Sequence, residues 1–101
     1  MDELTEIAFQ IILHAGNGRS SAMEAIQEAK EGNFEKADDL MKEAGEELAI
    51  AHGYHSRLLQ KEASGKSAPV NVILIHAQDH LMTAITVKDL ALEFVELYKN
   101  K

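Results

Sequence analysis

The stretch that decides the fold spans residues 72–83 and reads Val72-Ile73-Leu74-Ile75-His76-Ala77-Gln78-Asp79-His80-Leu81-Met82-Thr83. A row of mostly apolar residues runs through it at steps of four and three, the heptad spacing of a packed α-helix: Ile73, Ala77, His80, Ala84, Val87, Ala91, Phe94 and Tyr98. A second row comprises Leu74, Leu81, Ile85, Leu92 and Val95, and a third comprises Val72, Ile75 and Met82. We therefore expect this helix to be buried nearly all round between residues 72 and 87.

Two breaks divide the rest of the chain. The small, polar run from Ala63 to Pro69 predicts a loop, because glycine and proline punctuate helical patterns. Gly32 suits a helix C-cap and Asn33 the next N-cap. Three helical segments of roughly 30 residues result, and they predict an all-α, antiparallel three-helix bundle in a single domain, residues 1–101.

Both earlier segments carry apolar residues at helical spacing. In the first, Gly16-Asn17-Gly18 interrupts the pattern, and we expect a continuous helix with close packing there. In the second, one stripe is predicted to face the core: Phe34, Ala37, Leu40, Met41, Ala44, Leu48, Ala51, His55 and Leu58. A bundle of this size covers only part of each helix, so the remaining apolar side of the third helix predicts self-association.

The composition limits the kinds of molecule that the chain is expected to bind. The chain has 101 residues, a net charge of −7 and no cysteine. Such a charge disfavours nucleic acid and anionic membrane surfaces, and the absence of cysteine excludes disulfides and thiolate chemistry. The acidic start, Met1-Asp2-Glu3, is unlike a signal peptide, and no run of about 18 apolar residues occurs. We expect a cytoplasmic protein.

Polar residues interrupt the apolar third helix and each needs an explanation, since buried polar groups are paired or metal-bound. His76 and His80 are four residues apart on one face, a spacing that suits two zinc ligands, with Asp79 as a third. Alternatively, both are satisfied interfacial histidines. A third use is nucleophilic, because a neutral imidazole such as His76 can accept a phosphoryl group, with His80 and Gln78 as nearby donors.

Asp79 has no basic residue near it on its own helix, since none occurs between Pro69 and Lys88. If copies of the helix meet on a symmetry axis, their Asp79 carboxylates converge and require shared protons or a hard cation such as Mg²⁺. The alternative is that Asp79 faces solvent at a rim. We expect packing roles for His14, His52 and His55, and packing rather than anion binding for Arg19-Ser20-Ser21.

The segment from His76 to Thr83 resembles the signature of the lactose/cellobiose-type enzyme IIA of the bacterial sugar phosphotransferase system. Further stretches resemble that family in order and spacing: Ala15-Gly16-Asn17-Gly18-Arg19-Ser20, Gly32-Asn33-Phe34, Glu43-Ala44-Gly45, Ala51-His52, Glu62-Ala63-Ser64-Gly65 and Leu97-Tyr98-Lys99. One departure is Gly18, where the family more often has alanine, and we expect the first helix to be locally looser there.

The resemblance implies a phosphocarrier. His76 would take the phosphoryl group from the histidine-phosphorylated carrier HPr and pass it to a cysteine of the IIB component, which serves disaccharide uptake through the membrane component IIC. It also implies a homotrimer of three-helix protomers, a nine-helix bundle, with Asp79 meeting its symmetry mates around one Mg²⁺ per trimer. Gln78 and His80 would line the region of the active histidine. A helical oligomeric metal-binding or structural interaction module remains the alternative.

Overall fold

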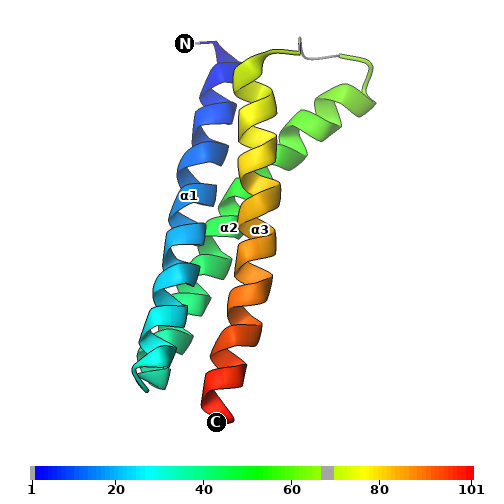
Figure 1. Ribbon diagram of the computed structural model, residues 1–101. Helices are drawn as coiled ribbons and strands as arrows, with labels where there is room; N and C mark the ends of the chain where they lie inside the picture. The colour runs from blue at the N-terminus through cyan, green and yellow to red at the C-terminus, as the bar shows by residue number, and fades with distance from the viewer. Residues whose placement is uncertain (1, 67–69) are drawn as a thin grey trace.

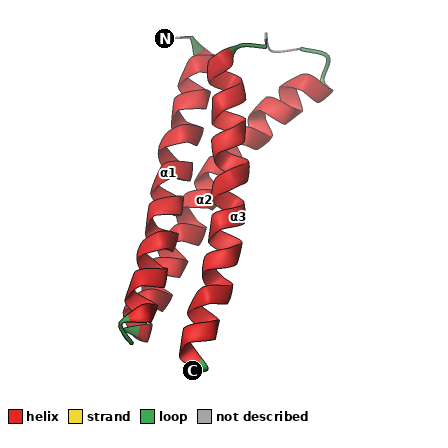
Figure 2. Ribbon diagram, in the orientation of Figure 1, coloured by secondary structure: helices red, strands yellow, loops and turns green. Residues whose placement is uncertain are grey.

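The structure is a computed structural model that describes residues 2–66 and 70–101. Three helices make up nearly all of it: α1 (Glu3–Lys30), α2 (Phe34–Ala63) and α3 (Val72–Lys99). Successive helices run in opposite directions, so α1 and α3 point the same way (Figure 1). No strand occurs within the described ranges, and short connections join the helices (Figure 2). The predicted all-α, antiparallel three-helix bundle is confirmed.

Specific groups cap the two ends of α1 and the start of α3. The Asp2 carboxylate accepts a 2.7 Å hydrogen bond from the Thr5 backbone N–H, and the Asn71 side chain accepts one of 2.9 Å from Leu74 N–H. At the end of α1, Gly32 has φ of +82°, where a residue without Cβ is favoured. The next amide, that of Asn33, then reaches the Glu28 carbonyl at 2.9 Å, closing a Schellman motif.

Both predicted boundaries lie where expected. The break at Gly32 is confirmed, and Asn33 is the N-cap residue of α2, although its side-chain amide donates to the Glu28 carboxylate at 3.0 Å and makes no capping bond. Gly65, with φ of +84°, ends α2 inside the predicted loop. The last part of that loop, Ser67 to Pro69, lies outside the described residues.

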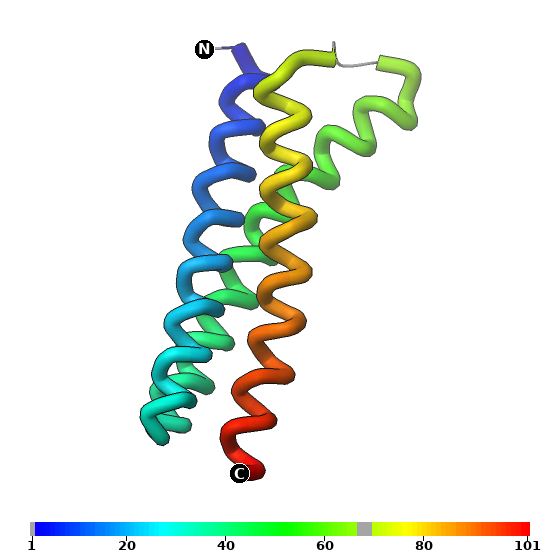
Figure 3. The backbone as a smooth tube through the Cα atoms, viewed as in Figure 1, coloured from blue at the N-terminus to red at the C-terminus, as the bar shows by residue number. Residues whose placement is uncertain are grey.

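Alanine dominates the core. Ile7, Ile11, Leu48 and Leu81 pack with buried alanines in one cluster near the chain's N-terminal end, and a second cluster lies around Met41 and Val95. Small side chains let helix axes approach closely along α1, which packs against both other helices. The C-terminal half of α2 bends away from α3 (Figure 3).

Close approach explains the glycines of α1. The helix runs unbroken through Gly16-Asn17-Gly18, as predicted. A Cβ at Gly18 would lie 2.8 Å from Leu48 Cγ and 3.2 Å from the Ala44 carbonyl oxygen. The expectation that this glycine loosens the helix is wrong, because its bare backbone is what allows α2 to pack there.

One side of α3 remains uncovered in the protomer. The exposed apolar face of α3 consists of Val72, Ile75, Met82, Leu90 and Leu97, which are 44–83% exposed. Phe94, predicted to lie in the packed row, is 45% exposed as well, because the row drifts out of the interface towards the C-terminus. A single protomer thus covers only part of α3, as the sequence pattern predicted, and all-round burial would need further copies of the chain.

Candidate functional site

His76 and His80 form a ring pair on the surface of α3. They lie one turn apart, with ring centroids separated by 5.7 Å and an angle of 23° between the planes. His76 is exposed, whereas His80 is half-buried against α1. Its Nε2 lies 3.3 Å from where a Cβ on Gly16 would be, so the ring fits against bare backbone. His76 is thus reachable from solvent and supported from one side.

Gln78 does not join this pair within the chain. Residues two apart on a helix face different directions, and the Gln78 side chain turns to α2, where its amide oxygen lies 3.1 Å from Nε2 of His55. His55 is 8% exposed, so this hydrogen bond satisfies a buried ring. The expected donor role of Gln78 towards His76 is therefore not supported in a single protomer.

Asp79 lies on the exposed face of α3 and not in the protomer's core, a position that fits both a rim and a symmetry axis between copies. Among the described residues, no lysine, arginine or histidine makes an ion pair with its carboxylate. The neighbouring hydroxyls of Thr83 and Thr86 are bonded to carbonyls of their own helix, at 3.1 and 3.2 Å. The face around Asp79 therefore presents methyl groups and one charge.

A metal site within one protomer is not supported. Across residues 2–66 and 70–101, no three histidine, aspartate or glutamate side chains come together as a ligand set. The stacked rings of His76 and His80 lie side by side, whereas two ligands of one zinc ion point their nitrogens at a common centre. The protomer therefore lends no support to a zinc ion held by these two histidines and Asp79.

Of the three remaining histidines, His14 and His55 have the packing roles that the sequence predicted, and His52 does not. His14 Nδ1 lies 2.6 Å from a Glu47 carboxylate oxygen and its ring stacks on Tyr54. His55 is buried beside Gln78, a pairing that sequence spacing did not indicate, since the partners are 23 residues apart on different helices. His52 is exposed on α2, so its expected packing role is wrong.

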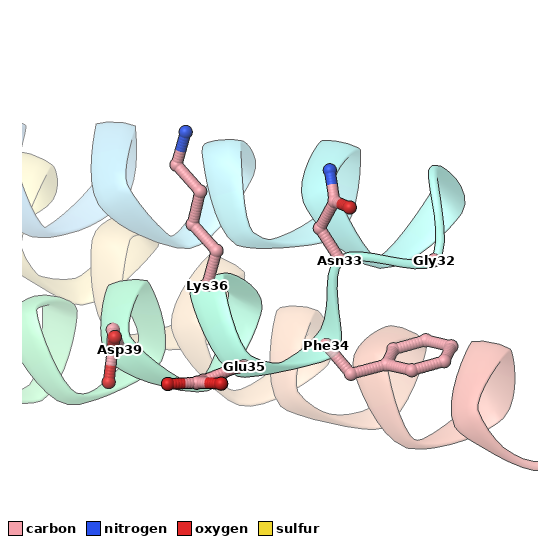
Figure 4. Close-up of a pocket in the computed structure, with 6 residues that line it drawn as sticks. All are labelled: Gly32, Asn33, Phe34, Glu35, Lys36 and Asp39. Carbon is pink, nitrogen blue, oxygen red and sulfur yellow. The ribbon is translucent and has the colours of Figure 1, made fainter.

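A pocket at the turn between α1 and α2 is a poor candidate. It measures about 620 Å³ and is lined by Gly32, Asn33, Phe34, Glu35, Lys36 and Asp39. The side chains of Phe34, Glu35 and Lys36 point in different directions (Figure 4), so no polar groups converge on a ligand. It also lies at the other end of the bundle from the start of α3 (Figure 1).

Comparisons with known proteins agree with this arrangement. Residues 6–99 match the family model described as "PTS system, Lactose/Cellobiose specific IIA subunit". The lichenan-specific phosphotransferase enzyme IIA component of Bacillus subtilis is 54% identical over 98% of this chain and 90% of its own length. The crystal structure of the cellobiose-specific enzyme IIA from Bacillus anthracis superposes with a TM-score of 0.96 at 52% identity, covering 99% of this chain and 92% of that one.

A more distant structure adds a partner. The solution structure of a complex of IIA(Chitobiose) with HPr, from the Escherichia coli phosphotransferase system, has a TM-score of 0.84 at 33% identity and covers 99% and 97% of the two chains. The fold and the matches together define a phosphotransferase component of the enzyme IIA class. The chain belongs to the lactose/cellobiose-specific IIA family of the phosphotransferase system, as the resemblance predicted. Among the helices described, none has the length and apolar character needed to cross a membrane.

Proposed function

We propose that this protein is a phosphocarrier in which His76 receives a phosphoryl group from phosphorylated HPr and delivers it to a cysteine of a IIB component. The sugar served would be a disaccharide of the cellobiose, lactose or chitobiose class. The observation that carries the proposal is the exposed imidazole of His76, stacked on His80 on a helix of a IIA-family chain. The structurally similar IIA(Chitobiose), solved in complex with HPr, supports HPr as the donor.

The chemistry is an in-line displacement at phosphorus. A ring nitrogen of His76 uses its lone pair to form a new P–N bond, while the P–N bond to the donor histidine breaks and its electron pair stays with that imidazole. In the second step a cysteine thiolate forms a P–S bond and His76 leaves with the electron pair of its P–N bond. His80, stacked one turn away, limits the positions that the His76 ring can take. Gln78 is assigned no part within one protomer.

The test uses the purified chain with enzyme I, HPr and phosphoenolpyruvate. The chain should acquire one acid-labile, base-stable phosphate, and His76→Gln should acquire none. His52→Gln is the matched control, because His52 is another exposed histidine, on α2. Equal labelling of the His76→Gln variant and the wild type would overturn the proposal.

We also propose a homotrimer that buries the exposed apolar face of α3. Five large apolar side chains share that face, more than the surface of a monomer usually presents in one strip. The Thr83 and Thr86 hydroxyls already donate hydrogen bonds to carbonyls of their own helix, so burying them leaves no donor without a partner. Two exposed carboxylates lie on this face, Asp79 between Ile75 and Met82 and Glu93 between Leu90 and Leu97, so the assembly must accommodate both.

A Mg²⁺ ion suits that group only in an assembly. A protomer contributes one carboxylate at Asp79, and a hard cation takes six or more oxygen ligands, including waters. Three converging Asp79 side chains would supply an all-oxygen set, and the ion would neutralise their mutual repulsion. The proposal predicts one Mg²⁺ per three chains, lost in the Asp79→Asn variant, as measured by elemental analysis of the dialysed protein.

A further inference from the structure

A groove of about 490 Å³ begins at His80 and runs along α1. It is lined by Gly16, Arg19, Ser20, Met23, Glu24 and His80. One face of α1 supplies most of this lining, because Arg19, Ser20 and Met23 follow Gly16 by three, four and seven residues. Because Gly16 lies against His80, this face adjoins the ring that stacks on His76.

Arg19 is the only basic side chain that lines this groove. Within the described part of the chain, no carboxylate oxygen lies within 4.0 Å of its guanidinium. Its Cα lies about 4.5 Å beyond Gly16 along the helix, and helical side chains lean towards the N-terminus. Since α1 and α3 run in the same direction (Figure 1), a side chain of this length at position 19 can extend along the groove towards His80, which lines it too.

The groove offers few competing partners. Among its lining residues, Glu24 carries the only negative charge, and Ser20 supplies an exposed hydroxyl. A guanidinium, a hydroxyl and an imidazole are the donors that recognise a tetrahedral, doubly charged oxyanion, and arginine binds phosphate in bidentate fashion.

We propose that Arg19 binds the phosphoryl group carried by His76, with the Ser20 hydroxyl as a second donor. This inference rests on the proposed function, since it assigns the anion partner of the phosphohistidine. Arg19 stabilises the phosphorylated form and takes no part in forming or breaking the P–N bond. Its effect is therefore on the equilibrium between phosphorylated HPr and the phosphorylated chain. Glu24 acts in the opposite direction by repelling the same group.

The experiment measures that equilibrium constant by mixing HPr and the chain with a limiting amount of phosphorylated HPr. Arg19→Gln should lower the constant about tenfold, the size of one charge-assisted hydrogen bond at its weaker limit. Glu24→Gln should raise it by about twofold, as expected for loss of a screened repulsion. Arg19→Lys keeps the charge without the planar fork and should give an intermediate value. Arg57→Gln, at the other exposed arginine, should leave the constant unchanged.

Added salt should lower the wild-type constant towards that of Arg19→Gln and leave the variant itself almost unaffected. A second arm titrates inorganic phosphate onto the unphosphorylated chain and follows the amide NMR signals of Arg19 and Ser20. These signals should move more on phosphorylation of His76 than with free phosphate at the same concentration, and the reverse would overturn the assignment to the phosphohistidine.

The outcomes separate this inference from the proposed function. If the wild type and Arg57→Gln are phosphorylated at His76 and Arg19→Gln has the same equilibrium constant, the inference alone is wrong. If the wild type accepts no phosphoryl group from HPr, the proposed function fails and the inference with it. Circular dichroism of each variant at the assay temperature establishes that the compared proteins are folded.

Discussion

The Gln78 amide oxygen on α3 lies 3.1 Å from Nε2 of His55 on α2, joining two helices that otherwise diverge towards this end of the bundle. Because His55 is buried, removal of its partner leaves a ring nitrogen unsatisfied. Gln78→Ala should therefore lower the free energy of unfolding by about 1–2 kcal/mol in urea titrations at fixed protein concentration. Gln60→Ala, at an exposed glutamine of α2, is the control and should cost much less. A double-mutant cycle with His55→Leu should show coupling, and additive effects would contradict the pairing.

Gly18 offers a second test of packing. In Gly18→Ala the new methyl group would meet Leu48 Cγ and the Ala44 carbonyl, and overpacking of this kind costs about 1–3 kcal/mol. The gain in helix propensity is about 1 kcal/mol, so a net loss of up to about 2 kcal/mol is expected in the unfolding free energy. Gly53→Ala, in the middle of α2 with nothing within 4 Å of the new Cβ, should be stabilising by about 1 kcal/mol. Equal effects of the two substitutions would show that the close approach at Gly18 is absent.

Gly18 also shows how much of the fold could be read from the sequence. Helical periodicity predicted all three helices and the break at Gly32, because each helix buries one stripe of residues at 3.6-residue spacing. The same pattern could not show which helix packs against Gly18, since that depends on the side chains of Leu48 and Ala44 on another element.

For the site, sequence reasoning brought His76 and His80 together correctly, because residues four apart share a helix face. It did not foresee that within one protomer Gln78 pairs with His55, because proximity along the chain does not show which helix a side chain faces. The signal that could have corrected this was the buried His55 in the α2 stripe, which needed a polar partner on a facing helix. Packing was favoured for Arg19 because the charges near it in sequence are mixed, and only the helix arrangement shows that Arg19 shares a groove with His80.

The ion pair between Glu3, at the start of α1, and Lys61, near the end of α2, predicts that the fold loses stability in acid. A 2.7 Å hydrogen bond from the Lys61 ammonium, followed by its charge and that of Arg57, holds the pKa of Glu3 below its usual value. A carboxylate with a lowered folded-state pKa stabilises the fold above its unfolded pKa of about 4.3, and this contribution is lost as the pH falls through the folded value. Urea midpoints should therefore drop less between pH 7 and pH 3 for Glu3→Gln than for the wild type. The exposed Glu35→Gln is the control, and an unchanged pH response in Glu3→Gln would contradict the assignment.

If the exposed apolar face of α3 forms the trimer interface, a charge introduced on it by substitution should prevent the trimer from forming. In the proposed trimer, Met82→Lys places three ammonium groups in an interface that otherwise gains about 1.5–3 kcal/mol for each fully buried methionine. Sedimentation velocity should show the variant as monomers at concentrations where the wild type is trimeric. Leu59→Lys, which replaces a similarly exposed apolar residue on α2, should leave the trimer intact. Dissociation by both substitutions would place the interface elsewhere.

Whereas a charge introduced at Met82 should dissociate the trimer, removal of the charge at Asp79 on the same face of α3 should not. Converging carboxylates are costly to bury, and replacing buried charges with apolar groups of similar size is often neutral or stabilising. Asp79→Leu should therefore preserve or strengthen the trimer, with a dissociation constant no higher than that of the wild type in sedimentation equilibrium. Chelation of Mg²⁺ should weaken the wild-type assembly, because the repulsion is then uncompensated, and should have no effect on the variant. Asp39→Leu, at an exposed aspartate on α2, keeps the wild-type response to chelation. A fall of Asp79→Leu to monomers would mean that this carboxylate holds the copies together by a different contact, and the axial position would have to be abandoned.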